Sequence, residues 1–177
     1  MKIVKQIRIN SPATRVWELA GPGYTDIDRW SSTVAHSESR GEEGRVCATS
    51  PVAGRTCQSD AGQVHETLVL YDAGSRQLAY EVVAKSMPGF VRKAVNTWTV
   101  QPVATDSATL EMSLEMDLAP PFNVLMVPLL KLKMGGMLMQ NLRDFKHFLE
   151  TSEPSPAKAK ALAKQKSARP AARSTID

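Results

Sequence analysis

The chain has 177 residues, of which 42% are hydrophobic and 23% are charged, and its formal net charge at pH 7 is +4. This length allows one domain with a sizeable core and is short for two, and no internal repeat divides it. The two cysteines and three histidines show no Cys-x-x-Cys or paired-histidine spacing, so we expect no metal site.

The net charge lies at the end of the chain. Residues 153–177 hold six basic and two acidic residues, which leaves sixteen of each sign in residues 1–152. The end segment is rich in Ala, Lys, Pro and Ser, so we expect a disordered, solvated tail that makes at most weak contacts with anionic partners. The folded domain, residues 1–152, is neutral, and we expect no nucleic-acid partner.

No targeting or membrane-spanning segment is expected. The first ten residues alternate apolar and polar side chains instead of forming a signal peptide, which favours a cytoplasmic protein. The most apolar stretch, residues 118–139, is interrupted by three prolines and by Lys131 and Lys133, which a membrane span would not tolerate. This stretch therefore predicts a core helix or an amphipathic surface helix.

The first elements in chain order are a strand and two short helices. Residues 2–9 alternate as a half-buried strand does, and Ser11 followed by Pro12 predicts the N-cap of a short helix that ends at Gly21. A second short helix is expected over residues 24–30. Six strand-like segments then follow, separated by turn signals, at residues 33–39, 45–49, 63–71, 77–85, 95–102 and 107–118.

The last strand and the helix after it are the clearest elements. Apolar residues alternate with polar ones from Leu110 to Leu118, which is typical of an antiparallel sheet with one dry face. A long helix, about residues 123–150, is the only candidate large enough to cover that face. The predicted fold is therefore α+β, in the order β-α-α-β6-α, with a curved antiparallel sheet of about seven strands wrapped around the long helix.

Several stretches resemble one protein family: VWELAG, IDRW, GRVC, HETLVLYD, LAYEVVAKSMPGFV, NTWTVQP, PLLKLKM and LRDFK. Together they resemble the polyketide cyclase/dehydrase and lipid transport family of the SRPBCC superfamily, which has the helix-grip fold of START and birch-pollen-allergen proteins. The resemblance covers about residues 1–150. It implies a deep cavity between the sheet and the long helix, and it implies no cofactor.

The long helix carries Gly135 and Gly136 beside several methionines, although glycine weakens a helix interior. Given the resemblance, these glycines make room for a ligand and Met134 supplies an adaptable apolar wall; alternatively the glycines allow close packing or a kink. The residues expected to line the cavity are Trp30, Glu66, Tyr80, Phe90, Trp98, Met112, Met134, Gly135, Gly136 and Leu138.

Glu66 is the candidate for chemistry. If Leu68 and Leu70 face inward on their strand, Glu66 faces inward with them and needs a partner, for which Arg45 on the expected preceding strand and Tyr80 are available. Such a carboxylate can transfer protons or anchor a polar ligand group. The alternative is a solvated carboxylate or a structural ion pair.

Other candidates carry less information. Trp30 and Trp98 have indole donors that can meet a ligand, but a buried tryptophan is more often a core residue than a ligand contact. Residues 86–90 form an apolar loop that suits a cavity rim or an ordinary hairpin. Cys47 and Cys57 are interpreted as separate thiols, with a disulfide across a hairpin as the alternative, and neither His36 nor His147 shows a partner pattern.

Three functions remain open. The first is binding of one hydrophobic small molecule, lipid-like or aromatic polyketide-like, in the cavity. The second is a cyclase, dehydrase or isomerase in which Glu66 moves protons with Arg45 or Tyr80. The third is a protein-interaction module that uses the basic tail.

Overall fold

The computed structural model describes residues 1–59 and 62–168. Seven strands form one sheet in the order β1-β7-β6-β5-β4-β3-β2, and each neighbouring pair is antiparallel. The strands are β1 (Lys2–Ile9), β2 (Val34–Ser39), β3 (Gly54–Ser59), β4 (Gly62–Asp72), β5 (Gln77–Ala84), β6 (Val91–Ala104) and β7 (Ser107–Leu118). The helices are α1 (Ala13–Ala20), the 3-10 helix η1 (Pro22–Arg29), α2 (Phe122–Leu125), α3 (Val127–Thr151) and α4 (Pro156–Ala168).

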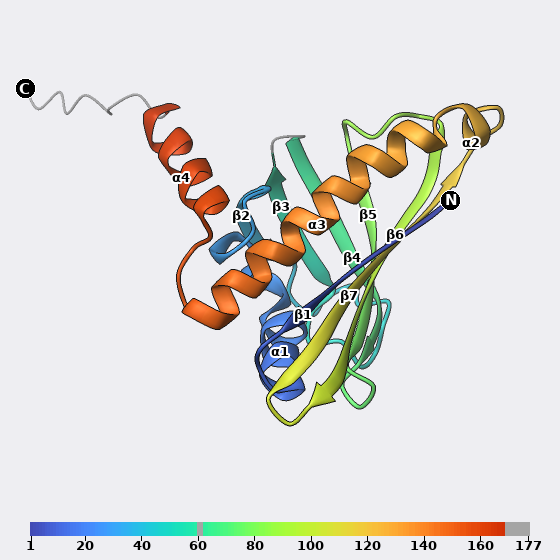
Figure 1. Ribbon diagram of the computed structural model, residues 1–177. Coiled ribbons are helices and arrows are strands. Elements are labelled where there is room, and N and C mark those ends of the chain that lie inside the picture. Colours follow the sequence, from blue (N-terminus) through green and yellow to red (C-terminus); the bar gives the residue numbers. More distant parts are fainter. Residues whose placement is uncertain (60–61, 169–177) are drawn as a thin grey trace, which may run out of the picture.

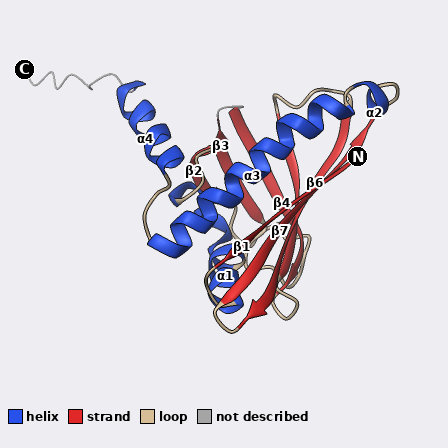
Figure 2. Cartoon of the chain, in the orientation of Figure 1, coloured by secondary structure: helices blue, strands red, loops and turns tan. Residues whose placement is uncertain are grey.

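The sheet curves around α3, as predicted. Figure 1 shows α3 lying across one face of the twisted sheet, with α1 near one end of the strands, and Figure 2 shows the same arrangement by element type. The side chains of β7 that were expected on the dry face are buried: Leu110, Met112, Leu114, Met116 and Leu118. The α+β helix-grip architecture is confirmed.

Helix α1 differs from the expectation only at its first turn. It begins at Ala13, and Pro12 rather than Ser11 holds the N-cap position, without a side-chain cap. The predicted apolar side is nevertheless buried, because Val16, Trp17 and Ala20 face the core. Packing of this stripe, rather than capping, stabilises the short helix.

The third strand lies later in the chain than predicted. Residues 45–49 form turns, and β3 begins at Gly54. Gly41 and Gly44 have φ values of 68° and 74°, so the segment before β3 cannot run as a regular strand. Gly54 is required where it stands, because a Cβ at this position would lie 1.9 Å from the backbone oxygen of Glu66. Apolar alternation could not reveal the true position of the third strand, because β3 is mostly polar.

A bulge changes the side-chain parity of β4. The pairing of β4 with β5 shifts between Leu68 and Leu70, so Leu68 is fully buried while Leu70 is 38% exposed. The inward direction predicted for Glu66 and Leu68 is confirmed, and the one predicted for Leu70 is wrong.

The long helix is divided and only partly covered. A break at Met126 separates α2 from α3, and the buried positions of α3 begin only at Gly135. Among the described residues, no helix is long and apolar enough to cross a membrane.

The expected disordered tail differs from the structure over residues 156–168, which form α4. Ser155 accepts a hydrogen bond from the backbone N–H of Lys158 at 3.1 Å, and its hydroxyl donates to the Asp144 carboxylate of α3. The Lys158 ammonium donates to the Val34 carbonyl at 2.8 Å, and both Ser155 and Lys158 are buried. Polar anchors therefore dock α4, and a composition argument based on apolar surface misses them. Residues 169–177 lie outside the described part of the chain.

Candidate functional site

A buried ion pair lies on the inner face of the sheet. The pairing of β3 with β4 places Arg55 opposite Glu66, and Arg55 Nε donates to Glu66 Oε2 at 2.6 Å. The Tyr24 hydroxyl from η1 donates to the same oxygen at 2.9 Å. Arg55 is fully buried and Glu66 is 8% exposed. Three elements that are separate in sequence therefore meet at one carboxylate oxygen.

Aromatic rings surround the guanidinium of Arg55. Its Cζ atom lies 3.9 Å from the ring centroid of Tyr24, 5.4 Å from that of Tyr80 and 5.9 Å from that of Trp98. Its Nη1 donates to the backbone oxygen of Tyr24. Burial disfavours the charged form, but the Glu66 carboxylate together with the nearby Tyr24, Tyr80 and Cys57 outweighs burial and raises the pKa of Arg55. Arg55 is therefore a cation held by one carboxylate and by ring faces.

Both tyrosines of this cluster keep their protons at neutral pH. Burial, together with the charge of Glu66, raises the pKa of Tyr24 and of Tyr80. Tyr24 takes the place beside Glu66 that was expected for Tyr80. The Tyr80 hydroxyl instead accepts a hydrogen bond from Asn96 Nδ2 at 2.8 Å, across the β5–β6 pairing.

A second layer of aromatic residues lies next to the ion pair. The ring centroids of Trp30 and Trp98 are 6.1 Å apart, and Phe145 of α3 meets Trp30 edge-on at 5.2 Å. Trp98 also packs against Tyr80 at 6.0 Å. Trp30, Trp98 and Phe145 are at most 1% exposed. The sheet, η1 and α3 thus enclose one aromatic cluster around Arg55.

Four polar atoms of this region are buried without a hydrogen-bond partner among the described residues. They are Trp30 Nε1, Trp98 Nε1, Arg55 Nη2 and Asn96 Oδ1. A buried polar atom without a partner typically costs about 1–3 kcal/mol, and proteins satisfy most such atoms. The cluster therefore has unused hydrogen-bonding capacity, and most of it consists of donors.

The sequence matches one family model, described as polyketide cyclase/dehydrase and lipid transport, over residues 1–150. The chain belongs to this family. No curated protein matches the sequence.

Solved structures with the same fold include enzymes and uncharacterised proteins. A START superfamily protein from Mycobacterium smegmatis is 11% identical, with a TM-score of 0.65, and the match covers 84% of this chain and 97% of that one. Norcoclaurine synthase from Thalictrum flavum, solved with a transition-state analogue, is 17% identical with a TM-score of 0.66, and the match covers 84% and 93%. One part of the di-domain aromatase/cyclase BexL of the BE-7585A biosynthetic pathway is 13% identical with a TM-score of 0.66, and the match covers 84% of this chain and 47% of BexL. At these identities the likeness shows the fold.

In this family member, most residues expected to line a cavity lie in the core beneath α3. Met112 stands opposite Trp98 in the β6–β7 pairing, and Met112 and Leu138 are at most 1% exposed. Met134 is half-buried against the core. Phe90 stacks on Phe122 at 4.5 Å, so it lies near α2 at the far end of α3.

Arg45 is not the partner of Glu66. It lies in the turn-rich segment before β3, forms an ion pair with Glu42 at 3.4 Å and donates to the Ser50 carbonyl at 3.0 Å. The predicted partner was wrong because the predicted strand was wrong, and Arg55 holds the position. Sequence reasoning also missed Tyr24 and Asn96, whose roles follow from contacts between distant segments.

The two glycines of α3 have different surroundings. A Cβ at Gly135 would lie 3.3 Å from Lys5 Cε and 3.8 Å from Ile3 Cγ2, so this glycine allows α3 to lie close to β1. Gly136 is exposed, and a Cβ there would meet nothing within 4 Å. Gly135 is a packing position, and the prediction that Gly136 lines a cavity is wrong because it faces outward.

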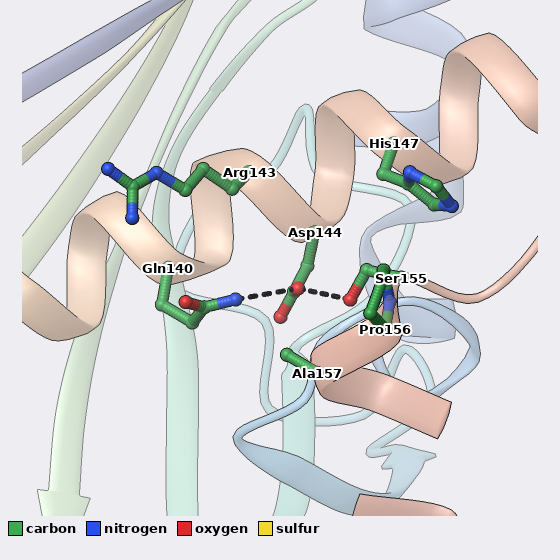
Figure 3. Close-up of a pocket in the computed structure, with 7 residues that line it drawn as sticks. All are labelled: Gln140, Arg143, Asp144, His147, Ser155, Pro156 and Ala157. Carbon is green, nitrogen blue, oxygen red and sulfur yellow. Dashed lines mark hydrogen bonds between the residues drawn. The ribbon is translucent and has the colours of Figure 1, made fainter. Parts of the chain in front are cut away.

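A hollow of about 300 Å³ lies where α4 meets α3, lined by Gln140, Arg143, Asp144, His147, Ser155, Pro156 and Ala157. Figure 3 shows Asp144 pointing toward Ser155 while Arg143 points away from it. The Asp144 carboxylate accepts hydrogen bonds from Gln140 Nε2 at 2.9 Å and from the Ser32 backbone N–H at 2.8 Å, in addition to Ser155. Its acceptors are thus taken by α3 itself, by the Ser32 backbone and by the Ser155 hydroxyl that docks α4, and the hollow does not converge on a reactive group.

Both cysteines are free thiols. Cys57 is buried on β3, and burial raises the pKa of its thiol, so it stays protonated at neutral pH. Within residues 1–59 and 62–168, no group of His, Cys, Asp and Glu side chains is arranged to hold a metal ion.

Proposed function

We propose that this protein binds a small, mostly apolar molecule between the inner face of its sheet and α3, and that the ligand carries at least one hydrogen-bond acceptor such as a carbonyl oxygen. The observation that carries the proposal is the set of unpartnered buried atoms. Trp30 Nε1, Trp98 Nε1 and Arg55 Nη2 are donors, so the group that satisfies them is an acceptor.

The aromatic side chains around these donors indicate the chemical nature of the remaining part of the ligand. The rings of Trp30, Trp98, Tyr80 and Phe145 offer faces and edges to an apolar or aromatic body. Such a molecule is an aromatic polyketide-like or lipid-like compound with a carbonyl group. The family and the fold support this class, since helix-grip proteins are built around this space.

Binding requires α3 to move away from the sheet, because the aromatic cluster is closely packed. None of the first eight residues of α3 is fully buried, and among them Val127, Leu130 and Met134 pack partly buried against the core. This half therefore has less buried surface to lose on separating from the sheet than the second half, which carries Leu138, Leu142 and Phe145.

The test pairs native mass spectrometry with a matched tryptophan exchange. We expect an apolar molecule to remain bound to the purified protein, and anilinonaphthalene sulfonate to compete with it. Trp98→Phe removes an unpartnered indole N–H and leaves a smaller aromatic ring in its place, so affinity for the co-purified molecule should fall about five- to tenfold, the worth of one hydrogen bond.

Trp17→Phe is the control, because Trp17 packs against Tyr71 at 5.5 Å, apart from the ion pair. It should leave the affinity within about twofold. Equal losses in both variants, or an unchanged Trp98→Phe, would show that the indole of Trp98 does not meet the ligand.

A second candidate function is proton transfer by Glu66. Its Oε2 accepts both hydrogen bonds, while Oε1 accepts none from the described residues. Both neighbours, Tyr24 and Arg55, donate to the carboxylate, so Glu66 stands as an acceptor and its role would be that of a base. Glu66→Gln should then abolish turnover of a genuine substrate and leave its binding within about tenfold, whereas a pure carrier would show no turnover to lose.

A further inference from the structure

The helical segment 122–132 exposes an unusual amount of apolar surface. Four large aliphatic side chains within nine residues are more than half exposed: Val124, Leu125, Leu129 and Leu132. Leu132 alone is 78% exposed. Isolated exposed leucines are ordinary, but a contiguous cluster on one end of a molecule marks a binding surface. We call residues 122–133 the α2/α3 face.

The charge of the same segment has one sign. Lys131 and Lys133 are exposed on α3, and residues 118–142 contain no aspartate or glutamate. Apolar side chains with interspersed lysines are the composition of helices that lie in the interface of a membrane with anionic lipids.

A second copy of the chain fits this face less well. A symmetric dimer would place the same patch on both sides of the interface, so Lys131 and Lys133 would approach their own copies. No acidic residue of the segment is available to balance them. An anionic lipid surface accepts both the leucines and the lysines.

We propose that the α2/α3 face binds the surface of a bilayer that contains anionic lipids. Figure 1 places α2 and the start of α3 at the end of the molecule away from α4, so the face can approach a flat surface without contact from the C-terminal helix. The stacked pair of Phe90 and Phe122 ties the loop before β6 to this face and holds α2 in position. This inference does not depend on the ligand proposed above.

The first test measures cosedimentation of the full chain with vesicles. We expect binding to vesicles of phosphatidylcholine mixed with phosphatidylglycerol, and weaker binding to phosphatidylcholine alone. Leu132→Glu should lower the partition coefficient about tenfold or more, because it removes an inserting side chain and adds a repelled charge. Val46→Glu is the matched control, since Val46 is 70% exposed outside this face, and it adds the same charge.

The second test separates the face from the basic C-terminal helix. Lys131→Gln/Lys133→Gln should lower binding to the anionic vesicles about fivefold for each lysine removed. Lys164→Gln/Lys166→Gln removes the same charge from exposed positions of α4 and should have a much smaller effect.

Three results would overturn the proposal: equal losses for Leu132→Glu and Val46→Glu, a larger loss for the α4 pair than for the α3 pair, or no vesicle binding by the wild-type protein. A wild-type dimer that Leu132→Glu converts to a monomer in sedimentation would assign the face to a second copy instead. Circular dichroism melting should show unchanged folding for every variant, because all the altered side chains are exposed.

Discussion

Breaking the Arg55–Glu66 pair should cause a large and strongly non-additive loss of stability. In Arg55→Met, the Glu66 carboxylate remains almost buried with the Tyr24 hydroxyl as its remaining donor, and the Tyr24 carbonyl loses its partner. In Glu66→Leu, the fully buried guanidinium keeps its charge without a counter-ion. Each single variant leaves one uncompensated charge in the core.

The expected losses of stability depend on whether a variant leaves an unpaired charge in the core. Removing one partner of a buried pair costs about 3–5 kcal/mol, so we expect this loss for each single variant. The double variant Arg55→Met/Glu66→Leu buries no charge and loses the two hydrogen bonds to Tyr24, at about 1 kcal/mol each. It should cost about 2 kcal/mol, which is less than either single variant and gives a coupling energy of at least about 4 kcal/mol.

Urea unfolding at pH 7, followed by tryptophan fluorescence, measures these free energies. Lys2→Met is the control, because Lys2 pairs with Glu115 at 2.7 Å on the surface and both side chains are more than half exposed. It should change stability little. Additive losses in the double variant, or an Arg55→Met loss no larger than that of Lys2→Met, would refute the argument that the pair is desolvated.

Three further predictions concern the tyrosines, the outward glycine and the last helix. The pKa values of Tyr24 and Tyr80 are raised in the folded state, so unfolding releases their protons above the ordinary pKa near 10. The contribution of the two tyrosines to stability should therefore be constant below that pH and then fall by about 1.4 kcal/mol per pH unit for each tyrosine. Tyr24→Phe should lessen this slope in urea titrations between about pH 10.5 and 12, and an unchanged slope would contradict it. Gly136→Ala should raise stability by about 0.5–1 kcal/mol in the same assay, since the new methyl group meets open space, and a loss would mean that Gly136 packs. Deleting residues 153–177 should lower the melting temperature by about 3–10 °C, because buried Asp144 loses its Ser155 donor; an unchanged value would show that α4 adds nothing.

The sequence predicts the fold well where one pattern runs long enough. The alternation over residues 107–118 and the inward position of Glu66 required only the two-residue period of a strand, and both are confirmed. The two-residue period predicts the wrong direction for Leu70, because the β4 bulge inserts one residue and so reverses which side chains face inward. A single extra residue has no signature in apolar spacing.

The partner of Glu66 could not be found by looking for an apolar strand. Strand β3 is Gly-Arg-Thr-Cys-Gln-Ser, and its place depends on pairing with β4 rather than on its own hydrophobicity. A usable signal was the short connection between Ser59 and Gly62. In an antiparallel hairpin, paired residue numbers have a constant sum, so the pairing of Ser59 with Gly62 places Arg55 opposite Glu66. The inward position of the carboxylate was predictable from the two-residue period alone, but finding its cation required the register of β3 against β4.

The apolar character of α3 on nearly all sides has a physical explanation in the structure. A helix that covers one sheet can bury one stripe, and the second half of α3 does so through Leu138, Leu142 and Phe145. The first half carries Leu129 and Leu132 on the outside, where the protein offers them no cover. Core packing therefore explains only part of the apolar content of this helix. We assign the uncovered part to an anionic lipid surface, because this segment carries exposed leucines and lysines and contains no aspartate or glutamate.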